Sequence, residues 1–153
     1  MRRAVLIAVS ILLTACAKPY VTSDTYILSD TLKLPYETAW KKTLQALNSR
    51  GFSIDTGSQE GGVITIGETP VKLNERQADC GNFHGISYLK DYRTSTSVKL
   101  IIDLEKVSDK ATAIRINSSL KASFSTGIGG DTTYLTCYSS GDFEKRLLAG
   151  IKE

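Results

Sequence analysis

Two stretches of alternating side chains limit the folds open to this chain more than any other feature. In residues 98–104 and 114–124, apolar side chains recur mostly at every second position, with polar or charged ones between them. A period of two is typical of strands that bury one face and expose the other. The turn-forming residues Ser108, Asp109 and Lys110 lie between the two stretches. We therefore expect an antiparallel hairpin whose second strand is the longest in the protein.

A further strand and a helix are expected before this hairpin. Residues 26–34 alternate in the same way. Apolar residues then recur at helical spacing over residues 36–47, with Trp40 in the middle of the buried stripe. We expect Arg50 in the last turn of this helix, and Gly51 at the point where it ends.

The remaining elements are shorter. Residues 52–56 and 62–67 are predicted to be two strands joined by a polar turn, and residues 134–138 to be a short strand. Ser139 or Ser140 can cap a last helix. Apolar side chains form the buried side of that helix: Phe143, Leu147, Leu148 and Ile151. The order strand, helix, strands, helix predicts an α+β domain, a two-layer antiparallel sheet with both helices packed on one face.

The first 16 residues have the pattern of an export signal. Arg2 and Arg3 precede an apolar run, residues 4–13, in which Ser10 is the only polar side chain. This run is shorter than the roughly 20 residues that a helix needs to cross a hydrocarbon core. Leu-Thr-Ala-Cys at residues 13–16 closes the segment.

This closing motif resembles the lipobox of bacterial lipoproteins. The resemblance implies a diacylglyceryl group on the sulfur of Cys16, cleavage before Cys16 and acylation of the new amino terminus. Residues 1–15 are then the signal peptide, residues 16–25 a lipidated tether and residues 26–153 a single α+β domain. Alanine rather than aspartate follows the cysteine, which in such lipoproteins implies the outer membrane, facing the periplasm. The alternative is an ordinary secretory signal that ends near a cysteine.

The charge balance argues against a nucleic-acid partner. The chain has 19 Lys and Arg against 16 Asp and Glu, and without Arg2 and Arg3 the balance is 17 against 16. A nucleic-acid-binding protein should carry a concentrated basic face. We expect the membrane to be contacted through the lipid alone.

Two cysteines remain after Cys16. In an exported chain, Cys80 and Cys137 predict a disulfide, and the alternative is two buried thiols. His84 is the only histidine, and a zinc site or a Cys–His nucleophile beside it would need reduced thiols. We therefore expect His84 to lie on a surface loop, with no metal and no cofactor. No two carboxylates are spaced as an acid–base pair, so we expect no enzymatic activity.

Residues 67–94 form the one segment without periodicity. Loops longer than about 12–15 residues are uncommon in compact domains unless they are functional or disordered. If Cys80 is bonded to Cys137, this loop is fixed to the sheet near its middle. Its aromatic and basic side chains are typical of a binding surface, and the candidates for contact with a partner are Arg76, His84, Tyr88, Tyr92 and Arg93. The alternative is an insertion that the disulfide merely stabilises.

A second resemblance comes from the first helix and its surroundings. Leu-Pro-Tyr-Glu-Thr-Ala-Trp at residues 34–40, Gly-Phe-Ser-Ile at residues 51–54 and Gly-Val-Ile-Thr-Ile at residues 62–66 resemble the repeat domain of BamC (NlpB-type) outer-membrane lipoproteins. The resemblance covers about 40 residues, and its motifs are structural. It implies a helix-grip fold and docking to another protein at the membrane, and it assigns no functional residue.

These observations favour a non-enzymatic outer-membrane lipoprotein that binds a protein of an envelope assembly or secretion complex. A second hypothesis is a module that binds cell-wall glycan or lipid in a groove between sheet and helices, with Tyr88 and Tyr92 as stacking surfaces. A third is an envelope hydrolase, which would depend on His84.

Overall fold

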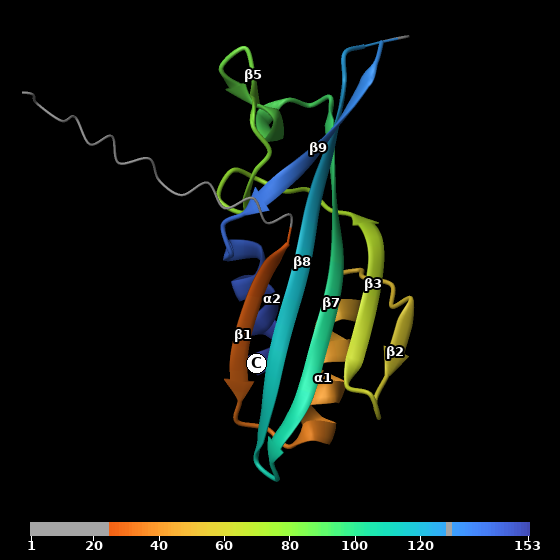
Figure 1. The fold of residues 1–153 in the computed structure, drawn as a ribbon, viewed down its shortest axis with the longest axis vertical. Coiled ribbons are helices and arrows are strands. Elements are labelled where there is room, and N and C mark those ends of the chain that lie inside the picture. The colour runs from red at the N-terminus through yellow and green to blue at the C-terminus, as the bar shows by residue number, and fades with distance from the viewer. Residues whose placement is uncertain (1–24, 128–129) are drawn as a thin grey trace, which may run out of the picture.

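The structure is a computed structural model that describes residues 25–127 and 130–153. A mostly antiparallel sheet carries two helices (Figure 1), so the predicted α+β class is confirmed. Cys16 and the expected signal segment lie outside the described residues. Within the described part of the chain, no helix is long and apolar enough to span a bilayer.

The elements follow the predicted order of strand, helix, strands, helix. They are β1 (Tyr26–Leu32), α1 (Tyr36–Asn48), β2 (Thr56–Ser58), β3 (Val63–Pro70), β4 (Ala78–Asp79), β5 (Asn82–Phe83), β6 (Ile86–Ser87), the 3-10 helix η1 (Tyr88–Lys90), β7 (Thr94–Ser108), β8 (Ala111–Ser125), β9 (Thr132–Ser139) and α2 (Asp142–Lys152). The segment expected to be irregular therefore contains the end of β3, three two-residue strands and η1.

β7 and β8 form the centre of the sheet. They pair antiparallel from Thr94 opposite Phe124 to Ser108 opposite Ala111. The expected hairpin is confirmed, although β7 and β8 have the same length of 15 residues. β3 and then β2 follow on the free side of β7. On the other side of β8, β1 and β9 lie end to end, because β1 pairs with residues 112–118 and β9 with residues 120–125.

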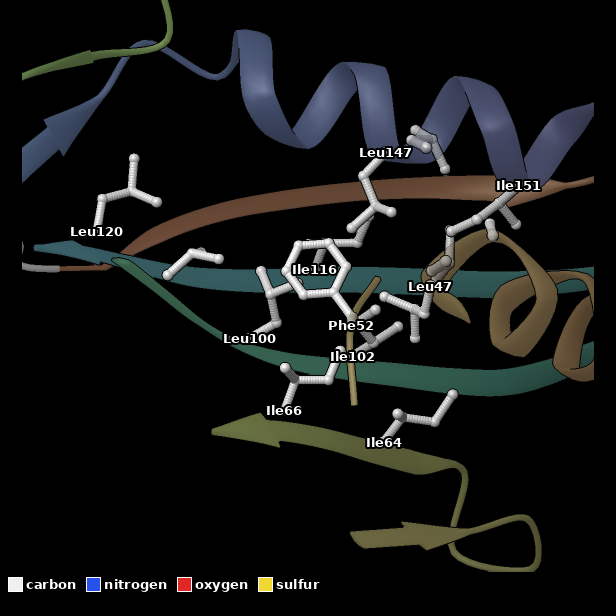
Figure 2. Packing of buried hydrophobic residues seen from close by; sticks show 14 of the residues in the cluster. Leu47, Phe52, Ile64, Ile66, Leu100, Ile102, Ile116, Leu120, Leu147 and Ile151 are labelled. Carbon is white, nitrogen blue, oxygen red and sulfur yellow. The ribbon is translucent and has the colours of Figure 1, made fainter. Parts of the chain in front are cut away.

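Both helices cover the same face of the sheet (Figure 1). Apolar side chains from alternate strand positions fill the space between the two layers (Figure 2). They include Ile64, Ile66, Leu100, Ile102, Ile116 and Leu120 from the strands and Leu47, Leu147 and Ile151 from the helices. Trp40 is also buried, as predicted. Lys99 and Arg115 occupy the intervening positions and are exposed, so the sheet has one buried and one open face.

One polar pair interrupts this apolar layer. Ser118 of β8 occupies an inward position and is 1% exposed, and Glu144 in the first turn of α2 is fully buried. The hydroxyl of Ser118 donates to the carboxylate of Glu144, and the Ser139 hydroxyl lies 2.9 and 2.8 Å from its two oxygens. A buried carboxylate requires such donors. These hydroxyls therefore fix the start of α2 against the sheet.

The end of α1 differs from the prediction by two residues. The helix ends at Asn48, so Arg50 follows the last turn rather than lying in it. Its guanidinium donates to the carbonyls of Ala46 and of Arg146 in α2, both at 3.0 Å. This position lets Arg50 connect the two helices. Gly51 has a left-handed backbone (φ +78°), as expected where a helix ends.

The start of α2 also differs from the prediction. Gly141 (φ +84°) holds the N-cap position that we expected for Ser139 or Ser140. The two serine hydroxyls still accept hydrogen bonds, Ser139 from the N–H of Gly141 at 3.0 Å and Ser140 from the N–H of Asp142 at 3.3 Å. A Cβ atom at position 141 would collide with the Tyr26 side chain, so any other residue would have to displace that ring as well as adopt a left-handed backbone.

The strand predicted over residues 52–56 is displaced along the chain, because residues 52–55 precede β2, which is Thr56–Ser58. Phe52 is buried in the core and contacts Phe143 of α2 edge to face, with 6.4 Å between ring centroids. The chain therefore turns into the core after α1 before it reaches the sheet. Pairing begins only at Thr56, and β2 is a fully exposed edge strand of three residues.

Candidate functional site

The segment between β3 and β7 is attached to the sheet near its middle. Cys80 and Cys137 form a disulfide, with 4.1 Å between their Cα atoms, which confirms the predicted pairing. Next to it, β4 pairs with β9, with Ala78 opposite Ser139. We call residues 78–93, together with the parts of β8 and β9 that they contact, the hairpin end of the molecule. It lies at the top of Figure 1, opposite the β7–β8 turn.

A short hairpin forms the outermost part of the hairpin end. β5 pairs with β6, with Phe83 opposite Ile86. The two residues between them, His84 and Gly85, both have positive φ, +50° and +81°. That combination is typical of a two-residue type I′ turn, which favours Asn or Asp followed by Gly. His84 is thus an unusual residue for its conformation.

An aromatic cluster supports this hairpin from below. Phe124 of β8 is 1% exposed, and its ring centroid lies 5.3 Å from that of Phe83 and 5.0 Å from that of Tyr88. The His84 ring lies 4.3 Å from that of Phe83. Ring pairs in this range stabilise by about 0.5–1.5 kcal/mol beyond the burial of their area. The hairpin is therefore held in place by Tyr88, which follows it in the chain, and by Phe124 at the end of β8.

Arg93 completes the cluster. Its guanidinium carbon lies 4.7 Å from the centroid of the Phe124 ring. The carboxylate of Asp91 accepts from the Arg93 guanidinium at 2.9 and 2.7 Å and from the Arg93 backbone N–H at 3.0 Å. These hydrogen bonds lower the pKa of Asp91 to about 2. The pair fixes the planar guanidinium over the ring.

The structure brings three of the five candidate contact residues together and leaves two apart. His84, Tyr88 and Arg93 belong to the aromatic cluster. Tyr92 is 95% exposed and stands outside the cluster. Arg76 is exposed, and its backbone is held by Ser140 and Asn74.

Sequence reasoning missed the apolar residues of the site. Phe83 is 39% exposed and Ile86 is 59% exposed, so the hairpin presents two large apolar side chains to solvent. Phe124 was expected only to be part of a strand, yet it is the centre of the aromatic cluster. The one feature of the sequence that could have indicated this hairpin is Gly85, which lies in the two-residue turn between Phe83 and Ile86.

The charges around the hairpin end are nearly balanced. Residues 71–93 contain four basic and three acidic residues, counting Lys and Arg against Asp and Glu. Lys90 is paired with Glu75 at 2.9 Å and Arg93 with Asp91 at 2.7 Å. The surface is therefore close to neutral, and its exposed tip is apolar.

The described residues around His84 form neither a cysteine–histidine nucleophile nor a metal-binding cluster. The sulfurs of Cys80 and Cys137 are bonded to each other, so neither is a thiolate beside His84. In the described residues, no three His, Cys, Asp or Glu side chains gather in a way that could hold a metal ion.

The expected groove between sheet and helices is filled by the core (Figure 2). Tyr88 packs on Phe124 rather than lining such a groove. Tyr92 lines a different, shallow hollow of about 580 Å³, formed by residues 70–73, 89–92 and 94–96. The two tyrosines therefore do not form opposite walls of one groove for a glycan.

No protein-family model matches this chain, and no curated protein matches it. Function must therefore be inferred from the residues of the hairpin end.

Proposed function

We propose that this chain is an outer-membrane lipoprotein that faces the periplasm and binds another envelope protein through its hairpin end, without catalysing a reaction. In this proposal Cys16 carries the lipid, residues 1–15 are removed, and the α+β domain works while attached to the membrane. The proposal is supported by one observation: the apolar side chains of Phe83 and Ile86 are exposed on the β5–β6 hairpin, which is fixed to the rest of the domain.

The geometry of the hairpin end suits protein binding. Interface hot spots are enriched in aromatic residues and arginine that enter the partner's pockets. A rigid segment that carries the contact residues loses less conformational entropy on binding than a mobile segment. Here the disulfide fixes the base of the hairpin, and Phe124 packs against Phe83 within it. Few degrees of freedom would then be lost when a partner covers Ile86.

The resemblance to BamC-type domains supports the same kind of function. We propose that the order strand, helix, strands, helix and the buried Trp40 reflect a helix-grip domain of that type. Docking to an envelope assembly or secretion complex is then the expected role. No binding residue is transferred from that family, so the site is argued from Phe83 and Ile86 alone.

Site-specific photocrosslinking tests the proposal. Ile86 is replaced by the photoreactive residue p-benzoylphenylalanine in the full-length protein, and intact envelopes are irradiated. Val107 provides a matched control, because it is 61% exposed against 59% for Ile86 and lies beside the β7–β8 turn at the opposite end. We expect one protein to be captured from position 86 and not from position 107.

Two results would contradict the proposal. One is that position 86 captures no protein or a random set of proteins. The other is equal capture of the same protein from positions 86 and 107, because a contact confined to the hairpin end cannot reach both ends of β7.

A further inference from the structure

We infer that the partner bound at the hairpin end is a protein embedded in the same membrane that holds Cys16. This inference rests on the proposed function, and it adds where the partner is and how the domain is oriented. Its basis is the direction of β1, the length of chain before it, and the charges of the hairpin end.

The direction of β1 turns the hairpin end toward the anchor. Tyr26 at the start of β1 lies opposite Ser118, and Leu32 at its end lies opposite Thr112. β8 runs the other way and reaches the aromatic cluster at Phe124. A chain that enters β1 at Tyr26 therefore comes from the side of the hairpin end (Figure 1).

The available length fits this orientation. Nine residues separate Cys16 from Tyr26, and fully extended they span about 30 Å. Phe124 is six positions beyond Ser118 in β8, which is about 20 Å at the rise of an antiparallel strand. The extended spacer thus reaches beyond the level of Phe124. To point the β7–β8 turn at the bilayer, it would have to reverse and run back along β1.

The charges favour a protein over the lipid surface as the occupant. Binding to anionic headgroups is typical of clusters of 4–8 unpaired Lys and Arg. At the hairpin end Lys90 and Arg93 are paired with Glu75 and Asp91. On the β5–β6 hairpin itself the exposed large apolar side chains are Phe83 and Ile86, and two such side chains suit a pocket in a partner better than insertion among acyl chains.

Lengthening the spacer tests the inference. If the partner is in the same bilayer, the short spacer keeps the domain in a thin layer beside the membrane, and for a flexible spacer the thickness of that layer grows roughly as the square root of spacer length. Inserting about 27 Gly and Ser residues between Asp24 and Thr25 makes the nine-residue spacer about fourfold longer. The layer then becomes about twice as thick, so we expect the initial rate of crosslinking from position 86 to fall about twofold.

A matched insertion controls for chain length. The same Gly/Ser segment placed between Asp109 and Lys110, in the exposed β7–β8 turn, leaves the spacer unchanged. We expect it to leave the crosslinking rate unchanged. The captured protein should also stay with the membrane after alkaline carbonate extraction, as integral membrane proteins do.

The outcomes separate this inference from the proposed function. Capture of a protein at an unchanged rate with the long spacer, or of a protein that carbonate releases, overturns the inference and leaves the proposed function standing. Capture of lipid alone from position 86 overturns both the inference and the protein-binding role. A loss of about twofold for an integral protein, with the matched insertion unchanged, supports both.

Discussion

The guanidinium carbon of Arg93 lies 4.7 Å from the ring centroid of Phe124, the residue on which the exposed hairpin rests. Asp91 holds that guanidinium with two hydrogen bonds. An ion pair and an aromatic cluster thus meet at one point, at the end of the central strand. Breaking the Asp91–Arg93 ion pair should therefore change the packing of the hairpin as well as the free energy of unfolding.

Replacing Asp91 by asparagine should make stability less dependent on acid pH. The pKa of Asp91 is about 2 in the folded protein, against an ordinary value of 3.8, because Arg93 donates hydrogen bonds to it. A lowered folded pKa gives stability that is present above the ordinary pKa and lost as the pH falls toward the folded value. Urea unfolding from pH 7 to 2 measures the effect. The midpoints of the wild type and Asp91→Asn should differ at neutral pH, and the difference should shrink as the pH falls from 3.8 toward about 2. A difference as large at pH 2 as at pH 7 would contradict the assignment.

Ser118→Ala should destabilise the protein although serine is a small residue. The change removes a donor from the buried Glu144 carboxylate, and leaving such a group under-satisfied costs about 1–3 kcal/mol. Ser119→Ala, on the half-exposed opposite face of the same strand, should stay within about 0.5 kcal/mol of the wild type. Equal losses for the two variants in chemical denaturation would argue against a role for the buried pair.

Two glycines with similar backbone angles should respond differently to alanine. Gly51 (φ +78°) has open space where a Cβ would be, so Gly51→Ala should cost only the left-handed conformation, about 1–2 kcal/mol. Gly62 (φ +71°) faces the backbone carbonyl of Leu104, and a Cβ there would collide with it. Gly62→Ala should therefore lower the free energy of unfolding clearly more than Gly51→Ala. Thermal or urea unfolding of both variants decides the order.

Removing the disulfide should destabilise the fold and release the hairpin end. The bridge joins residues separated by 57 positions, for which the chain-entropy model gives about 4 kcal/mol. The double variant Cys80→Ala/Cys137→Ala should lose a stability of that order. Amide hydrogen exchange should accelerate most in residues 81–90 and least in the middle of β7 and β8. Uniform acceleration would mean that the bridge supports the whole domain equally.

The sequence predicts the central hairpin and the first helix because their patterns lie in contiguous residues. Alternation over residues 98–104 is a property of one strand, and it requires no knowledge of neighbours. The Ser118–Glu144 pair, in contrast, depends on how α2 is placed over β8. The two residues are 26 positions apart, and no periodic window contains that relationship.

The candidate site was predicted only in part, because most of its residues form no pattern within a contiguous stretch of sequence. Cysteine count and export context were enough to pair Cys80 with Cys137. β5 and β6 have only two residues each, too few to show alternation, so Phe83 and Ile86 gave no strand pattern. The strand was predicted to begin at residue 52 rather than at Thr56 because the burial of Phe52 depends on its contact with Phe143, far along the chain.

The Cys80–Cys137 bond has a practical consequence for anyone who prepares this protein. Recombinant material made in a reducing cytosol would lack the bond that fixes the hairpin end to β9. We expect such material to retain a normal circular dichroism spectrum, since β7, β8 and both helices bury their own apolar core. We nevertheless expect such material not to bind the partner. A negative binding assay made with it would therefore not show that the oxidised protein fails to bind.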